Sequence, residues 1–366
     1  MAAATTRGEP LSAGQPLLAV NGLSTRFATD RGELLAVDGV SFELDRGETL
    51  GIVGESGSGK SVLVRSIMNI LPKAASVDPA SEVLLDGRDV RGLTLAEARH
   101  FFGVEVAMVF QDPMTSLNPV KKVGQQLTEP LRYHLGLNRT DARSRAVELL
   151  GHVGIPHPER RLSQYPHELS GGMRQRVTIA IALSCEPKLL IADEPTTALD
   201  VTVQKQILDL LQSLQEETGM GMILITHDLG VVAGRADRIG VMYAARLSEM
   251  APTRELFINP RHPYTTALMR SIPRVELPSH STLEAIPGRP PDMVSPPPAC
   301  RFAPRCPQAQ PTCGEVDPGY VVLDGPAHQW CCHFPTGTPE GDEALRRNTE
   351  AGVTAAGLDL RAEVVS

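Results

Sequence analysis

The chain lacks the features that mark membrane-spanning and nucleic-acid-coating proteins. No apolar stretch approaches the ~20 residues that a helix needs to cross a bilayer. The net charge of −8 provides no general attraction to nucleic acid or to an anionic membrane. The first residues, Met1 to Pro16, are small and polar without an apolar core, and they predict a disordered leader, not a signal peptide. We therefore expect a cytosolic protein that reaches a membrane only through a partner.

Cysteine is scarce along most of the chain. Five of the six cysteines lie between Cys300 and Cys332, whereas Cys185 stands in an apolar stretch and is expected to be a buried packing residue. In a reducing compartment, such clustering favours a metal or cluster site over disulfides.

Residues 17–258 alternate short apolar runs with longer helical stretches. Strands are predicted at Thr49–Val53, Val104–Phe110, Leu189–Ala192 and Met222–Thr226. Buried strands separated by helices indicate an α/β fold with a largely parallel sheet. Residues 112–170 read as helical, with Ala142–Val153 as the clearest amphipathic piece, and they predict a helical subdomain.

The composition changes after residue 258. Eight prolines between Pro273 and Pro298 exclude long regular elements there. We expect a small Pro- and Cys-rich C-terminal module over residues 259–334. Residues 335–366 are rich in Gly, Ala and Glu and are expected to form a disordered tail.

A glycine-rich segment, residues 54–61, reads GESGSGKS and has the pattern of a loop that cradles phosphates. Its glycines let backbone N–H groups turn toward a phosphate at the start of a helix. Lys60 would reach the β- and γ-phosphates, and the Ser61 hydroxyl would ligate Mg²⁺. The expected nucleotide-binding residues of this loop are Gly54, Glu55, Ser56, Gly57, Ser58, Gly59, Lys60 and Ser61.

Polar residues also follow the other predicted strands. Two adjacent acids, Asp193 and Glu194, end the strand that begins at Leu189, while Gln111 and His227 follow two further apolar runs. Ligands of open α/β sheets bind at the carboxyl ends of the strands, so we expect these residues to converge on the phosphate loop. Asp193 would hold Mg²⁺, and Glu194 would orient or deprotonate the attacking water.

A second anion-binding pattern occurs at Leu169, Ser170, Gly171, Gly172 and Met173, which combine a hydroxyl, two glycines and a helix start. One nucleotide does not need two such cradles from one chain. The ordered set of GESGSGKS, LSGGM and IADEP resembles the ABC ATPases. That resemblance implies that the LSGGM segment, here called the signature loop, covers the ATP of an opposite subunit. It thereby implies a head-to-tail dimer, linked across its interface by Ala198, Leu199 and Asp200.

The same resemblance implies roles for three more residues and a fold. Gln111 matches a glutamine that senses Mg²⁺ and water, and His227 matches a switch histidine that contacts the γ-phosphate and is catalytic with Glu194. Phe27 lies where the family places an aromatic that stacks on adenine, and a core position is an equal alternative. The implied fold is an ABC-type nucleotide-binding domain with a mostly parallel sheet core and a helical subdomain.

Further segments resemble the ATP-binding subunits of oligopeptide/dipeptide importers, an architecture shared by nickel importers and some glutathione importers. These segments are Gly51–Ser56, Phe110–Pro119, Leu199–Val203, His262–Thr265, Ser271–Arg274, Ile286–Gly288 and the region of Cys300 to Pro307. The resemblance covers residues 17–334 and fails at Ala245, where relatives usually carry glycine, which puts only a turn in doubt.

This closer resemblance implies an ATPase that energises peptide import at the cytoplasmic face of the cell membrane. The implied partners are two polytopic permease subunits, a second ATPase subunit and, indirectly, an extracellular substrate-binding protein. Because that protein and the channel choose the substrate, the cargo stays open between dipeptides, oligopeptides, nickel and glutathione.

Four cysteines, Cys300, Cys306, Cys313 and Cys332, are spaced more loosely than in a zinc knuckle. Four thiolates suit either Zn²⁺ or a 4Fe–4S cluster, and free thiols or disulfides are further alternatives. Relatives with this cysteine pattern are associated with a 4Fe–4S cluster, so the resemblance implies that cofactor, in a structural role, beside ATP and Mg²⁺. Cys332 is preferred over Cys331 because the family pattern ends in Cys-His.

Two other functions are less consistent with the sequence. ABC ATPases that act on nucleic acid or ribosomes typically insert long coiled coils or zinc modules, and the interval from Ser61 to Leu169 has room for little beyond a compact helical subdomain. Subunits that bind ATP without hydrolysing it usually lose the residues that Glu194, His227 and Ser170 supply here.

Overall fold

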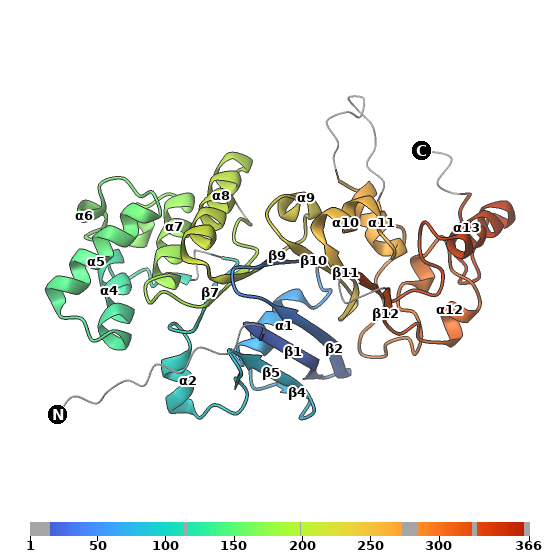
Figure 1. Cartoon of the computed structure of the whole chain (residues 1–366), viewed down its shortest axis with the longest axis horizontal. Helices are drawn as coiled ribbons and strands as arrows, with labels where there is room; N and C mark the ends of the chain where they lie inside the picture. Colours follow the sequence, from blue (N-terminus) through green and yellow to red (C-terminus); the bar gives the residue numbers. More distant parts are fainter. Residues whose placement is uncertain (1–14, 113–115, 198, 273–284, 324–327, 362–366) are drawn as a thin grey trace.

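The computed structural model describes residues 15–112, 116–197, 199–272, 285–323 and 328–361. Within these residues the strands form two sheets, flanked by helices and followed by a C-terminal module (Figure 1). The predicted disordered leader lies outside the described residues except for its last two positions.

The first sheet is antiparallel and comes from the N-terminal part of the chain. Its order is β2-β1-β5-β6, and β4 pairs with β1 at the side. A hairpin dominates the sheet, because β1 pairs with β2 from Leu18 opposite Leu44 to Thr29 opposite Gly32. The strands are β1 Leu18–Thr29, β2 Gly32–Leu44, β4 Ala75–Val77, β5 Glu82–Leu85 and β6 Arg88–Asp89.

The second sheet is mostly parallel and has the order β12-β13-β11-β10-β3-β9-β8-β7. Strands β10, β3, β9, β8 and β7 run parallel, and β11, β13 and β12 extend the sheet antiparallel. The strands are β3 Thr49–Val53, β7 Val106–Val109, β8 Leu189–Asp193, β9 Gly221–Thr226, β10 Arg238–Tyr243, β11 Arg246–Pro252, β12 Val321–Leu323 and β13 His328–Trp330. All four strands predicted from the sequence are present in it, which confirms the parallel sheet.

The central strands are buried on both faces, which explains their uninterrupted apolar sequences. Neighbouring residues of one strand enter different cores, because side chains alternate across a sheet. Ile191 and Ile223 pack with α1 Lys60–Ile67 and the antiparallel sheet. Leu190 and Leu224 pack on the other face, against α8 Val201–Thr218 and its neighbours.

The predicted helical subdomain consists of α4 Val123–His134, α5 Arg139–His152, α6 Pro158–Arg161 and the short 3₁₀ helix η1 Pro166–Glu168, and it packs against α7 Gly171–Ala182. On α5, Ala142, Ala146, Leu149 and Leu150 are buried at helical spacing. Further helices of the ATPase region, among the described residues, are α2 Leu95–Phe101, α9 Leu229–Val232 and α10 Thr253–Ile258. The subdomain lies at the opposite end of the molecule from the C-terminal module (Figure 1).

The C-terminal module is continuous with the core sheet, because β13 pairs with β11, with Trp330 opposite Glu249. Its helices are α11 Pro263–Arg270, the 3₁₀ helix η2 Ala303–Arg305, α12 Thr312–Glu315 and α13 Pro339–Ala351.

The expected disordered tail is wrong for residues 335–361, where α13 forms. Thr338 caps this helix by accepting the Gly341 N–H at 3.1 Å. Ala344 and Asn348, four residues apart, are buried on one face of α13. Because the segment is mostly polar, the sequence analysis did not predict a helix with this narrow buried face.

Candidate active site

The phosphate loop lies between β3 and α1, and its backbone requires glycine at both ends. Gly54 and Gly59 have φ angles of 154° and 106°. A Cβ on Gly54 would lie 2.1 Å from the carbonyl oxygen of Met242, and one on Gly59 would lie 2.3 Å from that of Ala36. Any other residue at either position would therefore push the loop away from the elements that support it.

Lys60 turns its ammonium group back across the loop. Its Nζ donates to the carbonyl oxygens of Gly54 at 2.7 Å and Glu55 at 2.9 Å. Burial lowers the pKa of Lys60, although the nearby carboxylates of Glu194, Asp193 and Glu55 act in the opposite direction. The Lys60 ammonium group therefore lies within the phosphate loop, held by two of its backbone carbonyl oxygens.

Ser61 and Asp193 form a pair suited to a divalent cation. The Ser61 hydroxyl donates to Oδ1 of Asp193 at 3.0 Å, and Asp193 is fully buried at the end of β8. Its second carboxylate oxygen, Oδ2, has no hydrogen-bond partner within the described residues. Burial raises the pKa of Asp193 against the opposing hydrogen bond from Ser61. Because an unpaired buried oxygen is costly, these residues fit Mg²⁺, which would supply the missing partner.

Glu194 joins three strand ends into one cluster. Its Oε2 accepts hydrogen bonds at 2.9 Å from Nε2 of Gln111 and from the hydroxyl of Thr197. Its Oε1 lies 3.5 Å from Nδ1 of His227. Glu194 has a φ of 45°, a left-handed conformation that is strained for a side chain of this size. The structure therefore brings together the residues predicted after β7, β8 and β9.

The signature loop begins α7 on the side of the helical subdomain (Figure 1). Ser170 caps this helix by accepting the Met173 N–H at 3.3 Å, and Leu169 is buried. A Cβ on Gly172 would lie 2.7 Å from Cγ1 of Val203, so glycine lets α7 approach α8 closely.

The residues predicted for the dimer interface are only partly described. Asp200 caps α8 by accepting the Val203 N–H at 2.9 Å, and Leu199 is half-buried. Ala198 lies outside the described residues.

Phe27 lies near the end of β1, opposite Leu34 of β2 and Ala75 of β4. It is half-buried, so its ring is accessible in part. Both expectations for Phe27, core packing and adenine stacking, stay open.

Two family patterns match the chain: the one described as ABC transporter over residues 37–197, and the one described as Oligopeptide/dipeptide transporter, C-terminal region, over residues 248–313. The chain is 49% identical over 332 residues to Oligopeptide transport ATP-binding protein OppD of Bacillus subtilis (strain 168), covering 90% of this chain and 93% of that protein. It belongs to the oligopeptide/dipeptide ABC transporter ATP-binding subunits.

Other relatives agree with this membership. Dipeptide transport ATP-binding protein DppD of Escherichia coli (strain K12) is 47% identical over 320 residues, covering 87% of this chain and 97% of that protein. Among solved structures, the ATP-binding cassette MJ0796 bound to ADP and Pi has a TM-score of 0.58 and 28% identity, covering 65% of this chain and 99% of that chain. These findings confirm the predicted family, the ABC cassette fold and an ATP-hydrolysing activity.

No helix in the described part of this ABC subunit is long and apolar enough to span a membrane.

The four cysteines singled out for an iron–sulfur cluster line one small cavity of about 10 Å³. Burial raises the pKa of the Cys306 and Cys332 thiols, which keeps them protonated in this arrangement. Across the described residues, no group of three or more His, Cys, Asp or Glu side chains is positioned to hold a metal ion. The predicted cluster is therefore not supported by this structure or by the relatives' names.

Two residues beyond position 258 contact the phosphate loop and were missed by the sequence analysis. The hydroxyl of Tyr264 accepts the Glu55 N–H at 2.9 Å, and Arg305 donates two hydrogen bonds to the Glu55 carboxylate. The only sequence signal was that both lie in segments resembling the importer family, since neither belongs to a phosphate-binding pattern.

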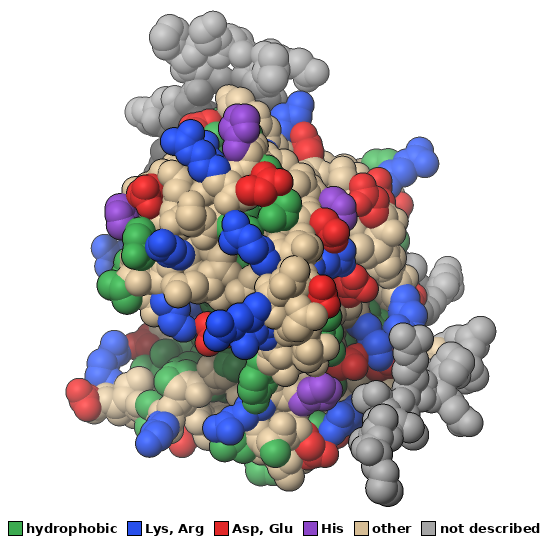
Figure 2. Space-filling model, turned by 90° about the vertical axis from the view of Figure 1, so that its left-hand side faces the viewer, with side chains coloured by type: hydrophobic (Ala, Val, Ile, Leu, Met, Phe, Trp, Pro, Cys, Tyr) green, Lys and Arg blue, Asp and Glu red, His purple; other side chains and the backbone are tan. Residues whose placement is uncertain are grey.

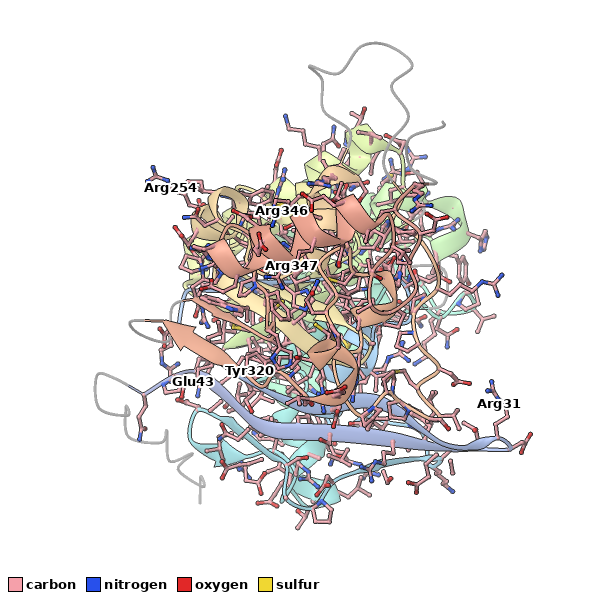
Figure 3. All side chains as sticks on the ribbon, turned by 90° about the vertical axis from the view of Figure 1, so that its right-hand side faces the viewer. Arg31, Glu43, Arg254, Tyr320, Arg346 and Arg347 are labelled. Carbon is pink, nitrogen blue, oxygen red and sulfur yellow. The ribbon has the colours of Figure 1, made fainter. Side chains whose placement is uncertain are left out.

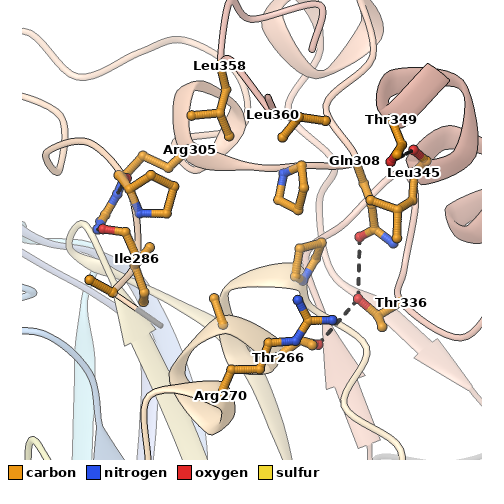
Figure 4. Close-up of a pocket in the computed structure, with 15 residues that line it drawn as sticks. Thr266, Arg270, Ile286, Arg305, Gln308, Thr336, Leu345, Thr349, Leu358 and Leu360 are labelled. Atoms are coloured by element: carbon orange, nitrogen blue, oxygen red, sulfur yellow. Dashed lines mark hydrogen bonds between the residues drawn. The ribbon is translucent and has the colours of Figure 1, made fainter. Parts of the chain in front are cut away.

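The C-terminal module also contains a cavity of about 270 Å³ between α11 and α13 (Figure 4). Thr336 accepts a hydrogen bond from Thr266 at 3.4 Å and donates one to Gln308 at 3.3 Å. Leu345, Leu358 and Leu360 supply apolar walls.

Proposed function

We propose that this chain is the ATP-hydrolysing subunit that energises an ABC importer for peptides. The observation that carries the proposal is the cluster in which Glu194 contacts Gln111 and His227, beside the Ser61–Asp193 pair. This arrangement has the parts that phosphoryl transfer needs: a phosphate cradle, a divalent-cation site and a group that positions water. The relatives named for oligopeptide and dipeptide transport support peptides as the cargo.

Within this proposal, residues 54–61 bind the ATP phosphates through their N–H groups and Lys60. Ser61, Asp193 and Gln111 would hold Mg²⁺, which neutralises charge on the phosphates when it is bound. Glu194 accepts a proton from, or orients, the attacking water. His227 contacts the γ-phosphate. Phe27 either stacks on the adenine or packs in the core, the two alternatives that its half-buried position leaves open.

A second part of the proposal concerns the signature loop. Ser170 and the glycines after it form a helix start that suits a phosphate, yet the loop belongs to α7 and not to the phosphate loop of the same chain. We propose that Leu169–Met173 completes the ATP site of a second ATPase subunit, with Ala198, Leu199 and Asp200 at the interface.

We propose two polytopic permeases as the membrane partners, with the chain at the cytoplasmic face and a substrate-binding protein outside. A groove of about 480 Å³ on the helical subdomain is a suitable contact site for a permease. Ser116 lines this groove and is close in sequence to Gln111 of the ATP site. Tyr133, which is 67% exposed, and His134 lie along it. On the face of the molecule where the helical subdomain lies, positive and negative side chains are interspersed (Figure 2).

Purification from native membranes in mild detergent tests these partners. We expect two polytopic proteins and a second ATPase subunit or a second copy of the chain. Tyr133→Asp should reduce that recovery, while Leu95→Asp, an exposed position on α2, should not. Recovery with nucleic acid or ribosomes alone would overturn the importer proposal.

The cargo is tested on the purified complex with its binding protein. Peptides should stimulate ATP hydrolysis more strongly than nickel ions or glutathione do. Stimulation by nickel or glutathione alone would replace the peptide proposal with one of those alternatives.

For the four cysteines, a 4Fe–4S cluster remains our finer hypothesis, with zinc as the alternative. It rests on four thiols lining one cavity, and binding would require these side chains to rearrange. Protein purified without oxygen should contain iron and sulfide and absorb near ~400 nm if the hypothesis holds. A preparation with one zinc and no iron would reject the cluster. A preparation without either metal would show that the cysteines are free thiols.

A further inference from the structure

The phosphate loop is held by side chains from the C-terminal part of the chain. Arg305 donates from Nη1 to Oε2 of Glu55 at 2.7 Å and from Nη2 to Oε1 at 2.9 Å. This is a two-pronged ion pair, the strongest geometry between these groups. The hydroxyl of Tyr264 accepts the backbone N–H of the same Glu55 at 2.9 Å. Side chain and backbone of one loop residue are thus fixed together.

Arg305 is itself fixed from several directions. Its side chain is 3% exposed, and its Nε donates to the carbonyl oxygen of Pro287 at 2.8 Å. Its guanidinium carbon lies 5.7 Å from the ring centre of Tyr243. Tyr243 is the last residue of β10, the strand that pairs with β3. A buried guanidinium with this many partners has little freedom, so it fixes the position of the Glu55 carboxylate.

A second arginine in the same segment supports the far end of the loop. Arg301 donates to the carbonyl oxygen of Ala244 at 2.6 Å. Ala244 and Ala245 have φ angles of 44° and 70°, and the Ala245 N–H donates to the carbonyl oxygen of Ser58 at 2.9 Å. Both alanines are in the left-handed conformation, which is strained for a residue with a Cβ, so the turn depends on such support.

We propose that Arg305 is a positioning residue for ATP binding, acting through Glu55. It keeps the first half of the phosphate loop in the shape in which its N–H groups receive phosphate, so that binding does not have to order the loop. Arg305 does not itself touch the nucleotide. The inference rests on the proposed placement of ATP at residues 54–61.

Arg305 should affect the binding of ATP and not its hydrolysis. Glu194 contacts both Gln111 and His227. Within the described residues, the side-chain hydrogen bonds of Arg305 go instead to Glu55, Tyr243, Pro287 and Ile286. Loss of Arg305 should therefore weaken ATP affinity and leave hydrolysis at saturating ATP nearly unchanged. A purely structural role would instead lower thermal stability without a selective change in affinity.

The experiment measures the Kd for MgATP, the KM and the kcat of the full-length chain, together with its melting temperature. Arg305→Ala should raise Kd and KM about tenfold while kcat stays within about twofold. Arg305→Lys should fall in between, because lysine cannot form the two-pronged pair. Arg254→Ala is the control: Arg254 is exposed on α10, away from the loop, and should leave all values unchanged (Figure 3).

Two milder variants decide the matter if Arg305→Ala does not fold. Tyr264→Phe removes only the hydroxyl that accepts the Glu55 N–H. Glu55→Gln removes the charge and leaves one of the two acceptor oxygens for Arg305. Each should raise the Kd about threefold. The double variant Glu55→Ala with Arg305→Ala should bind no more weakly than Arg305→Ala, since both remove one interaction.

An unchanged Kd in folded Arg305→Ala, or fully additive effects in the double variant, would overturn the positioning role. Lys60→Ala keeps this failure distinct from failure of the ATP site. If Lys60→Ala binds MgATP like the wild type, the placement of ATP at residues 54–61 is what has failed.

Discussion

At the residue scale, Glu194 shows how separate segments of sequence produce one reactive group. Three strands deliver Gln111, Glu194 and His227 to the same edge of the sheet, and the Glu194 carboxylate bridges the other two. The strained φ of 45° directs it there. This convergence was predictable, because parallel strands end at one edge.

We expect Glu194→Gln to reduce ATP hydrolysis at least ~100-fold, since a base or water-positioning carboxylate contributes that much or more. ATP binding should persist, because Ser61 and Asp193 keep their geometry. Single-turnover hydrolysis and equilibrium binding of MgATP check both statements. Wild-type turnover in the variant would remove Glu194 from the proposed role.

His262 gives the fold a pH dependence of its own. This buried residue caps α11 by accepting the Tyr264 N–H at Nδ1, at 3.1 Å. Burial lowers the pKa of His262 to about 4, against the opposing influence of the Glu249 carboxylate and the Cys331 backbone. Between pH ~6.5 and ~4 the unfolded chain therefore binds a proton that the folded chain does not. The stability that neutral His262 gives the folded chain is complete above pH ~6.5 and is lost as the pH falls toward 4.

Urea unfolding at several pH values tests this. Between pH 7 and pH 4, the free energy of unfolding of the wild type should fall by up to about 3 kcal/mol more than that of His262→Asn. The reason is that asparagine keeps a helix cap but does not titrate. His152→Asn, at an exposed position of α5, should follow the wild type. Identical curves for His262→Asn and wild type would contradict the assignment.

At the scale of elements, buried strands were the most predictable part of the fold. Their apolar runs are continuous because both faces are covered, as the alternation of Ile191 and Leu190 between two cores illustrates. Helix α13 was not predictable, because its three buried residues, Gly341, Ala344 and Asn348, stand among charged ones and give little periodic signal. The contact of Arg305 with Glu55 was also invisible, since it joins positions 250 residues apart without a shared pattern.

The attachment of α13 depends on Asn348. Its Nδ2 donates to the carbonyl oxygens of Pro307 at 2.8 Å and Ala309 at 3.0 Å. Asn348→Ala should cost about 1–3 kcal/mol, because buried carbonyls lose their donor. Hydrogen exchange should then be faster in α13 and unchanged in β8. Arg346→Ala, on the outer face of α13, is the control: it removes only exposed ion pairs and should change exchange far less than Asn348→Ala does (Figure 3).

At the scale of the whole molecule, the phosphate loop and the signature loop belong to different parts of the structure. The phosphate loop lies between β3 and α1, whereas the signature loop starts α7 on the side of the helical subdomain. A partner that moves that subdomain would move the signature loop with it, because α4 and α5 pack directly on α7.

The most direct test of the account is ATP-driven uptake of a labelled peptide into proteoliposomes that contain the complete complex. Vesicles with the wild-type chain should accumulate peptide in the presence of MgATP and the binding protein. Vesicles with the Glu194→Gln chain should contain the assembled complex and accumulate none. Equal uptake by both chains, or no uptake by the wild type with a full complement of partners, would contradict it.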